Sequence, residues 1–239
     1  MNDNSTIAID ETDAGQRDCD RPGNITRSML GYGVLAGPLY LVVGLVEALT
    51  RSGFDLARHD LSLLANGPLG WVHITLLVLS GLMTVTAAVG ARRALVEDRG
   101  SGQGATWGPR LLAGYGLGLI GAGVFVADPM YGFPLGTPDG PATAVTASGT
   151  LHFVCGALGF VCLIAATFVF ARRFAARRQP GLARYSRATG VVFLAGFVGI
   201  ASGSNNPLIV LGFWIAVIVG WVWLAVVSAH LYRGTRRES

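Results

Sequence analysis

The chain lacks lysine altogether and has few charged residues of any kind. All 18 basic residues among its 239 are arginines, and only 13% of the chain is charged, whereas soluble domains carry about a quarter. So few charges cannot cover a soluble globule of this size, and the absence of lysine excludes Schiff-base chemistry and an SxxK dyad. Apolar residues make up 51% of the chain, with a mean hydropathy of +0.52. This composition favours a membrane protein.

We expect neither a disulfide framework nor a secretory leader, although the chain has three cysteines. Cys155 and Cys162 lie seven residues apart in one apolar run, about 10 Å along a helix, which is too far for a bridge. Residues 1–28 are polar and acidic without an apolar stretch, so they are not a signal peptide. We expect a disordered cytoplasmic tail over 1–28 and a second cytoplasmic tail over 233–239.

Soluble-enzyme motifs are absent too, because the chain has no HExxH, GxSxG, CxxC or Walker sequence. The stretch from Gly116 to Gly121 matches the dinucleotide fingerprint GxGxxG, but it lies inside an apolar run with no strand before it. Glycines recur from Gly114 to Gly123 at spacings that include small-xxx-small pairs. We interpret them as a face on which two membrane helices approach closely.

Six apolar segments predict an all-α, polytopic transmembrane bundle over residues 29–232. A helix needs about 20 apolar residues to cross a bilayer, and an alternating barrel pattern is absent. The fifth segment is short and rich in glycine, which makes it the one candidate for a discontinuous helix. The segments are 30–49, 71–89, 111–127, 151–171, 188–203 and 208–231.

The arginines predict the orientation of these spans. Sixteen of the 18 lie before the first span, between spans two and three, between spans four and five, or after the last span; only Arg51 and Arg58 lie on the other side. The positive-inside rule places the rich side in the cytoplasm, so we expect a multi-pass plasma-membrane protein with both termini inside. The arginines would meet membrane lipids with anionic headgroups. No basic patch with interleaved aromatics indicates nucleic acid.

Ionisable side chains gather at the outer ends of the spans, where they are candidates for function by default. Three of the four histidines lie there. The candidates are Glu47, Arg51, His59, Asp60, Ser62, His73, Asp128, His152 and Asn205.

Structural interpretations exist for several of these residues. Glu47 precedes Arg51 by four residues, the favourable order for a helical ion pair. Asp60 can cap a short loop helix. Asp128 ends the third span, where the helix dipole disfavours a carboxylate, so it needs a donor, a cation or water. His73 and His152 each begin a span, where the dipole favours the neutral imidazole.

Three functional hypotheses use the same residues. The first is an outward-facing polar pocket that binds a small ligand or lipid for transport, sensing or assembly, with Glu47, Arg51, His73 and Asn205 as ligand-binding residues. The second is a metal-dependent hydrolase acting on an ester or amide such as a lipid. In that hypothesis His59, Asp128 and His152 hold zinc, which activates water, and Asp60 and Ser62 complete the catalytic group. The third is a haem protein with His73 and His152 as axial ligands.

Two long motifs carry a family resemblance. The segments 59–71 and 123–134, followed by 149–152, resemble the signature of the family called domain of unknown function 998. The resemblance covers about residues 30–230 and implies a six-helix membrane protein, with no activity attached. It also implies that relatives often carry Gln at the position of His73, which argues against His73 as an essential ligand.

Overall fold

The computed structural model describes residues 21–97 and 103–235. Over these residues the chain forms six α-helices and one short 3-10 helix, η1, with an isolated bridge between Met130 and Phe133 as the only β pairing. The predicted all-α class is confirmed. The α-helices are α2 (Arg21–Thr50), α3 (Gly70–Glu97), α4 (Gln103–Val124), α5 (Ala147–Ala176), α6 (Pro180–Ala201) and α7 (Pro207–Gly234), and η1 spans Leu61–Ala65.

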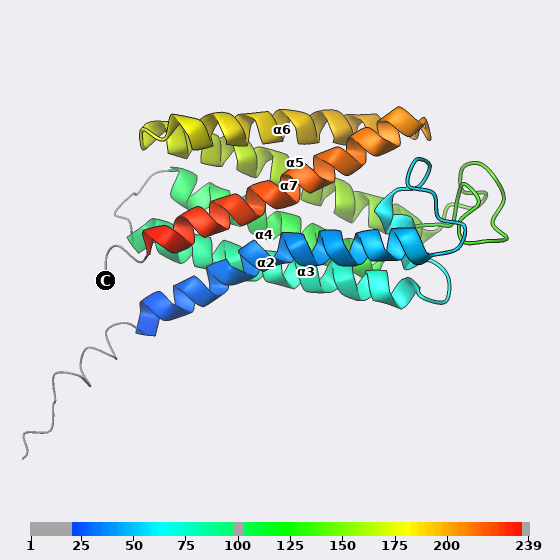
Figure 1. The fold of residues 1–239 in the computed structure, drawn as a ribbon, viewed down its shortest axis with the longest axis horizontal. Helices are drawn as coiled ribbons and strands as arrows, with labels where there is room; N and C mark the ends of the chain where they lie inside the picture. The colour runs from blue at the N-terminus through cyan, green and yellow to red at the C-terminus, as the bar shows by residue number, and fades with distance from the viewer. Residues whose placement is uncertain (1–20, 98–102, 236–239) are drawn as a thin grey trace, which may run out of the picture.

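The helices form a closed ring in chain order. Each one packs against the next, and α2 packs against α7 to close the ring. In Figure 1, α2 begins and α7 ends at the same end of the bundle, while η1 and the long loop between α4 and α5 lie at the opposite end. This second end, called the outer end below, carries most of the candidate residues.

Four of the six helices are long and apolar enough to cross a bilayer by themselves. These are the segments Gly23–Thr50, Gly70–Val96, Ala147–Ala176 and Pro207–Gly234. The helices α4 and α6 do not reach that standard; each has 22 residues, about 33 Å at 1.5 Å per residue. Arg110 in α4, and Arg184 and Arg187 in α6, lower their mean hydropathy. The helix α6, which was the one candidate for a discontinuous helix, is continuous.

The first helix begins earlier than the sequence predicts. It starts at Arg21, inside the segment 1–28 assigned to the tail, and residues 1–20 lie outside the described part of the chain. The early start has a packing reason, because Thr26 and Leu30 are fully buried. The Thr26 hydroxyl also accepts a hydrogen bond of 3.2 Å from Nε of Arg93 in α3.

The glycines of α4 bring it into backbone contact with both neighbours. A Cβ at Gly118 would lie 2.6 Å from Cα of Gly159 in α5, and a Cβ at Gly116 would lie 2.7 Å from the carbonyl oxygen of Gly81 in α3. Such approaches strengthen dispersion contacts where no water drives association. The interpretation of this stretch as a packing face is confirmed. Cys155 and Cys162 are both free, as expected.

We predict that Gly118→Ala lowers stability although alanine is the better helix former. The propensity gain is about 1 kcal/mol, but the added methyl would meet the α5 backbone, and overpacking typically costs about 1–3 kcal/mol. Gly212→Ala is the matched control, because a Cβ there meets nothing within 4 Å. Thermal unfolding in detergent should place Gly118→Ala below the wild type and Gly212→Ala at or above it. Equal stability of the two variants would contradict the close approach.

Candidate functional site

At the outer end, η1 fills the space between α2 and α3. Asp60 caps this short helix: its Oδ1 accepts hydrogen bonds from the Leu63 backbone N–H at 3.3 Å and from the Ser62 hydroxyl at 2.8 Å. The predicted N-cap is confirmed. Leu63 and Leu64 are fully buried. The Asp60 cap therefore stabilises a short helix whose leucine side chains fill this part of the ring.

Both ring nitrogens of His59 form hydrogen bonds with the backbone. Nδ1 accepts from the N–H of Asp55 at 2.9 Å, and Nε2 therefore carries the proton that it donates to the carbonyl of Tyr131 at 2.9 Å. The residue is only 2% exposed. His59 thus ties the α2–α3 loop to the α4–α5 loop and has no lone pair left for a metal.

Arg51 is also engaged by the backbone and not by Glu47. Its guanidinium donates to the carbonyls of Leu64 at 3.1 Å and Asn66 at 2.6 Å, and it lies 5.3 Å from the centre of the Phe133 ring. The Glu47–Arg51 ion pair expected from the spacing is therefore not formed. Arg51 lies just beyond the end of α2, where its guanidinium donates to these two carbonyls instead of to Glu47.

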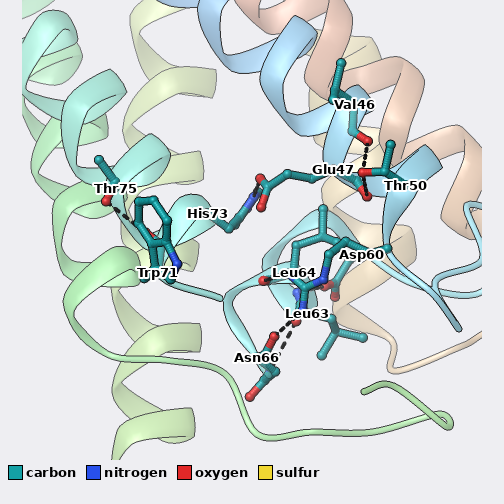
Figure 2. A network of polar contacts seen from close by, with 11 residues as sticks. Val46, Glu47, Thr50, Asp60, Leu63, Leu64, Asn66, Trp71, His73 and Thr75 are labelled. Carbon is teal, nitrogen blue, oxygen red and sulfur yellow. Dashed lines mark hydrogen bonds and ion pairs between the residues drawn. The ribbon is translucent and has the colours of Figure 1, made fainter. Parts of the chain in front are cut away.

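Glu47 pairs instead with His73 across the contact between α2 and α3. Figure 2 shows the two side chains pointing toward each other, with Nδ1 of His73 2.9 Å from Oε2 of Glu47. His73 is fully buried and the Glu47 side chain is 8% exposed. Oε1 of Glu47 and Nε2 of His73 have no hydrogen-bond partner within the described residues. A buried pair of this kind becomes costly when one partner is removed.

Asp128 acts at the start of α5 and not at the end of α4. The helix α4 already ends at Val124, and the Asp128 carboxylate accepts from both the backbone N–H of Thr146 at 2.9 Å and its hydroxyl at 2.6 Å. Thr146 is the N-cap of α5. A Cβ on Gly149 would collide with the Asp128 carboxylate, so glycine makes room for it. The sequence pattern predicts Asp128 at the end of a helix, where the helix dipole disfavours a carboxylate. The structure corrects this, because Asp128 lies beside the start of α5, where the dipole favours the charge.

His152 provides the reciprocal contact from α5 to α4. Its Nδ1–H donates to the carbonyls of Ala122 and Phe125 at 2.8 and 2.9 Å, and these belong to the last turn of α4 and the residue just beyond it. Carbonyls at a helix end otherwise lack partners. Together Asp128 and His152 fasten the end of one helix to the beginning of the next.

The residues proposed as zinc ligands do not form a metal site. Within residues 21–97 and 103–235, no group of three or more His, Cys, Asp or Glu side chains is placed to hold a metal ion. His59 has both nitrogens engaged, and the Asp128 oxygens face the start of α5. A haem with His73 as a ligand does not fit either, because His73 faces Glu47 and does not line the cavity described next. These donor sets therefore do not fit zinc or haem.

A cavity of about 470 Å³ runs from the outer loops into the middle of the ring. All six helices contribute to its wall, which is mainly apolar. Aromatic rings are frequent in it, including Phe160, Phe197 and Phe213. A volume of this size is within the range of small-molecule sites, about 300–1,000 Å³. The cavity differs from the polar pocket that the sequence predicts, because polar groups occupy only parts of an apolar wall.

Polar residues at the mouth come from three separate loops. Arg58 is bridged to the exposed Asp139 at 3.2 Å, Tyr131 donates to the carbonyl of Gly203 at 3.1 Å, and Asn205 lies in the α6–α7 loop. Of the residues predicted from the sequence, the cavity wall includes Asp60, Ser62, His152 and Asn205; it does not include Glu47, Arg51, His59, His73 or Asp128.

Sequence reasoning missed the polar aromatics deeper in the cavity. Tyr40 of α2, Tyr115 of α4 and Trp221 of α7 line it together. The Trp221 ring lies 5.0 Å from the ring of Tyr40 and 5.6 Å from that of Tyr115. The signal that could have found them is a tyrosine in the middle of an apolar span, because a buried hydroxyl usually needs a partner.

We predict that His73→Leu destabilises the protein by about 3–5 kcal/mol, because it leaves the Glu47 carboxylate buried without a donor. His73→Gln keeps a side-chain N–H and should cost clearly less. The double variant Glu47→Leu/His73→Leu removes the charge as well and should recover most of the loss. Unfolding in detergent, followed by circular dichroism, measures all three. A double variant as unstable as His73→Leu alone would show that the unpaired Glu47 carboxylate is not the reason.

The two family-like motifs meet in space at the outer end, where His59 contacts Tyr131 and the Asn66 amide donates to the carbonyl of Ala127 at 3.1 Å. No curated protein and no solved structure matches the chain. A family model described as a protein of unknown function (DUF998) matches residues 34–230. The match covers most of the chain and the whole helical ring except its ends, so this protein belongs to the DUF998 family.

Proposed function

We propose that this chain is a six-span protein of the plasma membrane that binds one small amphipathic ligand or lipid in the central cavity. The observation that carries the proposal is the cavity itself, which has a polar mouth and a mainly apolar wall inside a ring of membrane helices. An apolar site with a few placed polar groups is the usual form of a small-molecule site.

The placement of charge supports six spans with both termini in the cytoplasm. Four helices qualify as spans by themselves, and α4 and α6 are enclosed between them in the ring. Of the 14 arginines within residues 21–97 and 103–235, 12 lie in the helix halves or short loops nearest the end at which α2 begins. Under the positive-inside rule that end faces the cytoplasm, and the mouth of the cavity then faces outward.

The distribution of polar groups supports an amphipathic occupant. Among the described residues, Arg58 is the one arginine on the cavity wall, and it lies at the mouth with Ser62 and Asn205. These groups can hold a polar or anionic head, such as a phosphate. The interior offers rings and aliphatic side chains to an apolar body. Transport, sensing and assembly would all begin with this binding step.

We predict opposite labelling of two engineered cysteines in intact cells. In a variant whose native cysteines are replaced by serine, Asp139→Cys lies in the exposed α4–α5 loop, and Gly181→Cys lies exposed in the first turn of α6. A membrane-impermeant maleimide should label position 139 in whole cells and position 181 only after lysis. The reverse pattern would overturn the proposed orientation.

We also predict that filling the cavity removes a bound lipid. Gly156 lines the cavity, and a Cβ there meets nothing within 4 Å, so Gly156→Trp can place its ring inside without disturbing the helix. Gly212→Trp is the control, because it also has open space but does not line the cavity. Native mass spectrometry should detect lipid adducts on the wild type and on Gly212→Trp, reduced about tenfold or more on Gly156→Trp. Equal adducts on all three would argue against the cavity as the site.

A further inference from the structure

The inner end of the cavity contains hydroxyl groups that nothing in the protein satisfies. Tyr40 and Tyr115 are 7% and 4% exposed, and both line the cavity. Neither phenolic hydroxyl has a hydrogen-bond partner within residues 21–97 and 103–235. Nε1 of the neighbouring Trp221 is enclosed and also lacks a partner. An enclosed donor without a partner, such as Nε1 of Trp221, is rare and costly in native proteins.

These groups lie far from the mouth. Tyr115 is nine residues before the end of α4 at Val124, about 14 Å along the helix. Tyr40 is ten residues before the end of α2 at Thr50, about 15 Å. Since both helices end at the outer end, the two hydroxyls lie at a similar depth, in the part of the bundle where water is scarce.

The charges nearby select the kind of group that can reach them. The arginine on the cavity wall, Arg58, lies at the mouth, so nothing basic on the described wall near Tyr40 and Tyr115 would pair with an anion. A tyrosine hydroxyl donates well to an uncharged oxygen. An apolar chain end would leave both donors unsatisfied, whereas a carbonyl oxygen would satisfy one or both.

We propose that the inner end is a second polar subsite, where the Tyr40 and Tyr115 hydroxyls donate hydrogen bonds to an uncharged carbonyl oxygen of the ligand. This inference rests on the proposed function and specifies its ligand class: an amphiphile with a polar head at Arg58 and a ketone, quinone or ester oxygen at its buried end. The ring of Trp221, packed against both tyrosines, forms the floor of the subsite.

A matched pair of probes tests the subsite separately from the cavity. Dodecyl phosphate has the head and the apolar chain, and its analogue with a ketone on the penultimate carbon adds the acceptor. Full-length protein in nanodiscs is titrated with each probe, and bound probe is counted by native mass spectrometry. We expect the ketone probe to bind the wild type about tenfold more tightly.

Variants assign that preference to the tyrosines. Tyr40→Phe and Tyr115→Phe remove only a hydroxyl, so each should reduce the ketone preference and leave binding of dodecyl phosphate unchanged. Tyr185→Phe is the control, because Tyr185 lies in α6 outside the cavity wall, and it should keep the preference. Equal binding of the two probes by the wild type overturns the inner subsite and leaves the proposed function standing. Binding of neither probe overturns both.

Discussion

A polar atom buried in this bundle needs a hydrogen-bond partner, and that requirement sorts the polar residues into two groups. In the first group the protein supplies the partner: His59 and Arg51 are satisfied by backbone carbonyls and N–H groups, and Asp128 and His152 by the facing ends of α5 and α4. In the second group the partner must come from elsewhere, as for Tyr40 and Tyr115. The first group builds the outer end, and in our proposal a ligand serves the second; Oε1 of Glu47 and Nε2 of His73 belong to neither group, because they lack partners away from the cavity wall.

Much of the fold could be predicted from the sequence because apolar length and glycine spacing are local properties. Each predicted span lies within or overlaps one of the six helices, and the α4 glycines do form close contacts with α3 and α5. The Asp60 cap was also predictable, since the capping residue and the N–H it accepts from are three residues apart. The predicted helix starts were less accurate. Thr26 lies in α2 and contacts Arg93 of α3, and a contact between residues so far apart leaves no local sequence pattern.

The candidate site was harder to predict because its partners are far apart in the chain. Glu47 could be expected to pair with Arg51 four residues on, yet its partner is His73, 26 residues away. The role of Asp128 depends on where α4 ends and on the position of Thr146, 18 residues later. The cavity follows from how six helices close a ring, so no single segment contains its signal. Residue types alone could therefore indicate that the outer end carries candidate functional residues. They could not indicate which of these side chains form hydrogen bonds that hold the fold together.

The reciprocal contacts of Asp128 and His152 have a consequence for the long segment that connects α4 to α5. Both contacts lie where the segment joins the helices. The distance and angle between α4 and α5 therefore do not depend on the conformation of residues 131–145. The mostly exposed residues 141–145 can then change with little strain on the ring beneath, whereas Tyr131 and the buried Phe133 are held by His59 and Arg51.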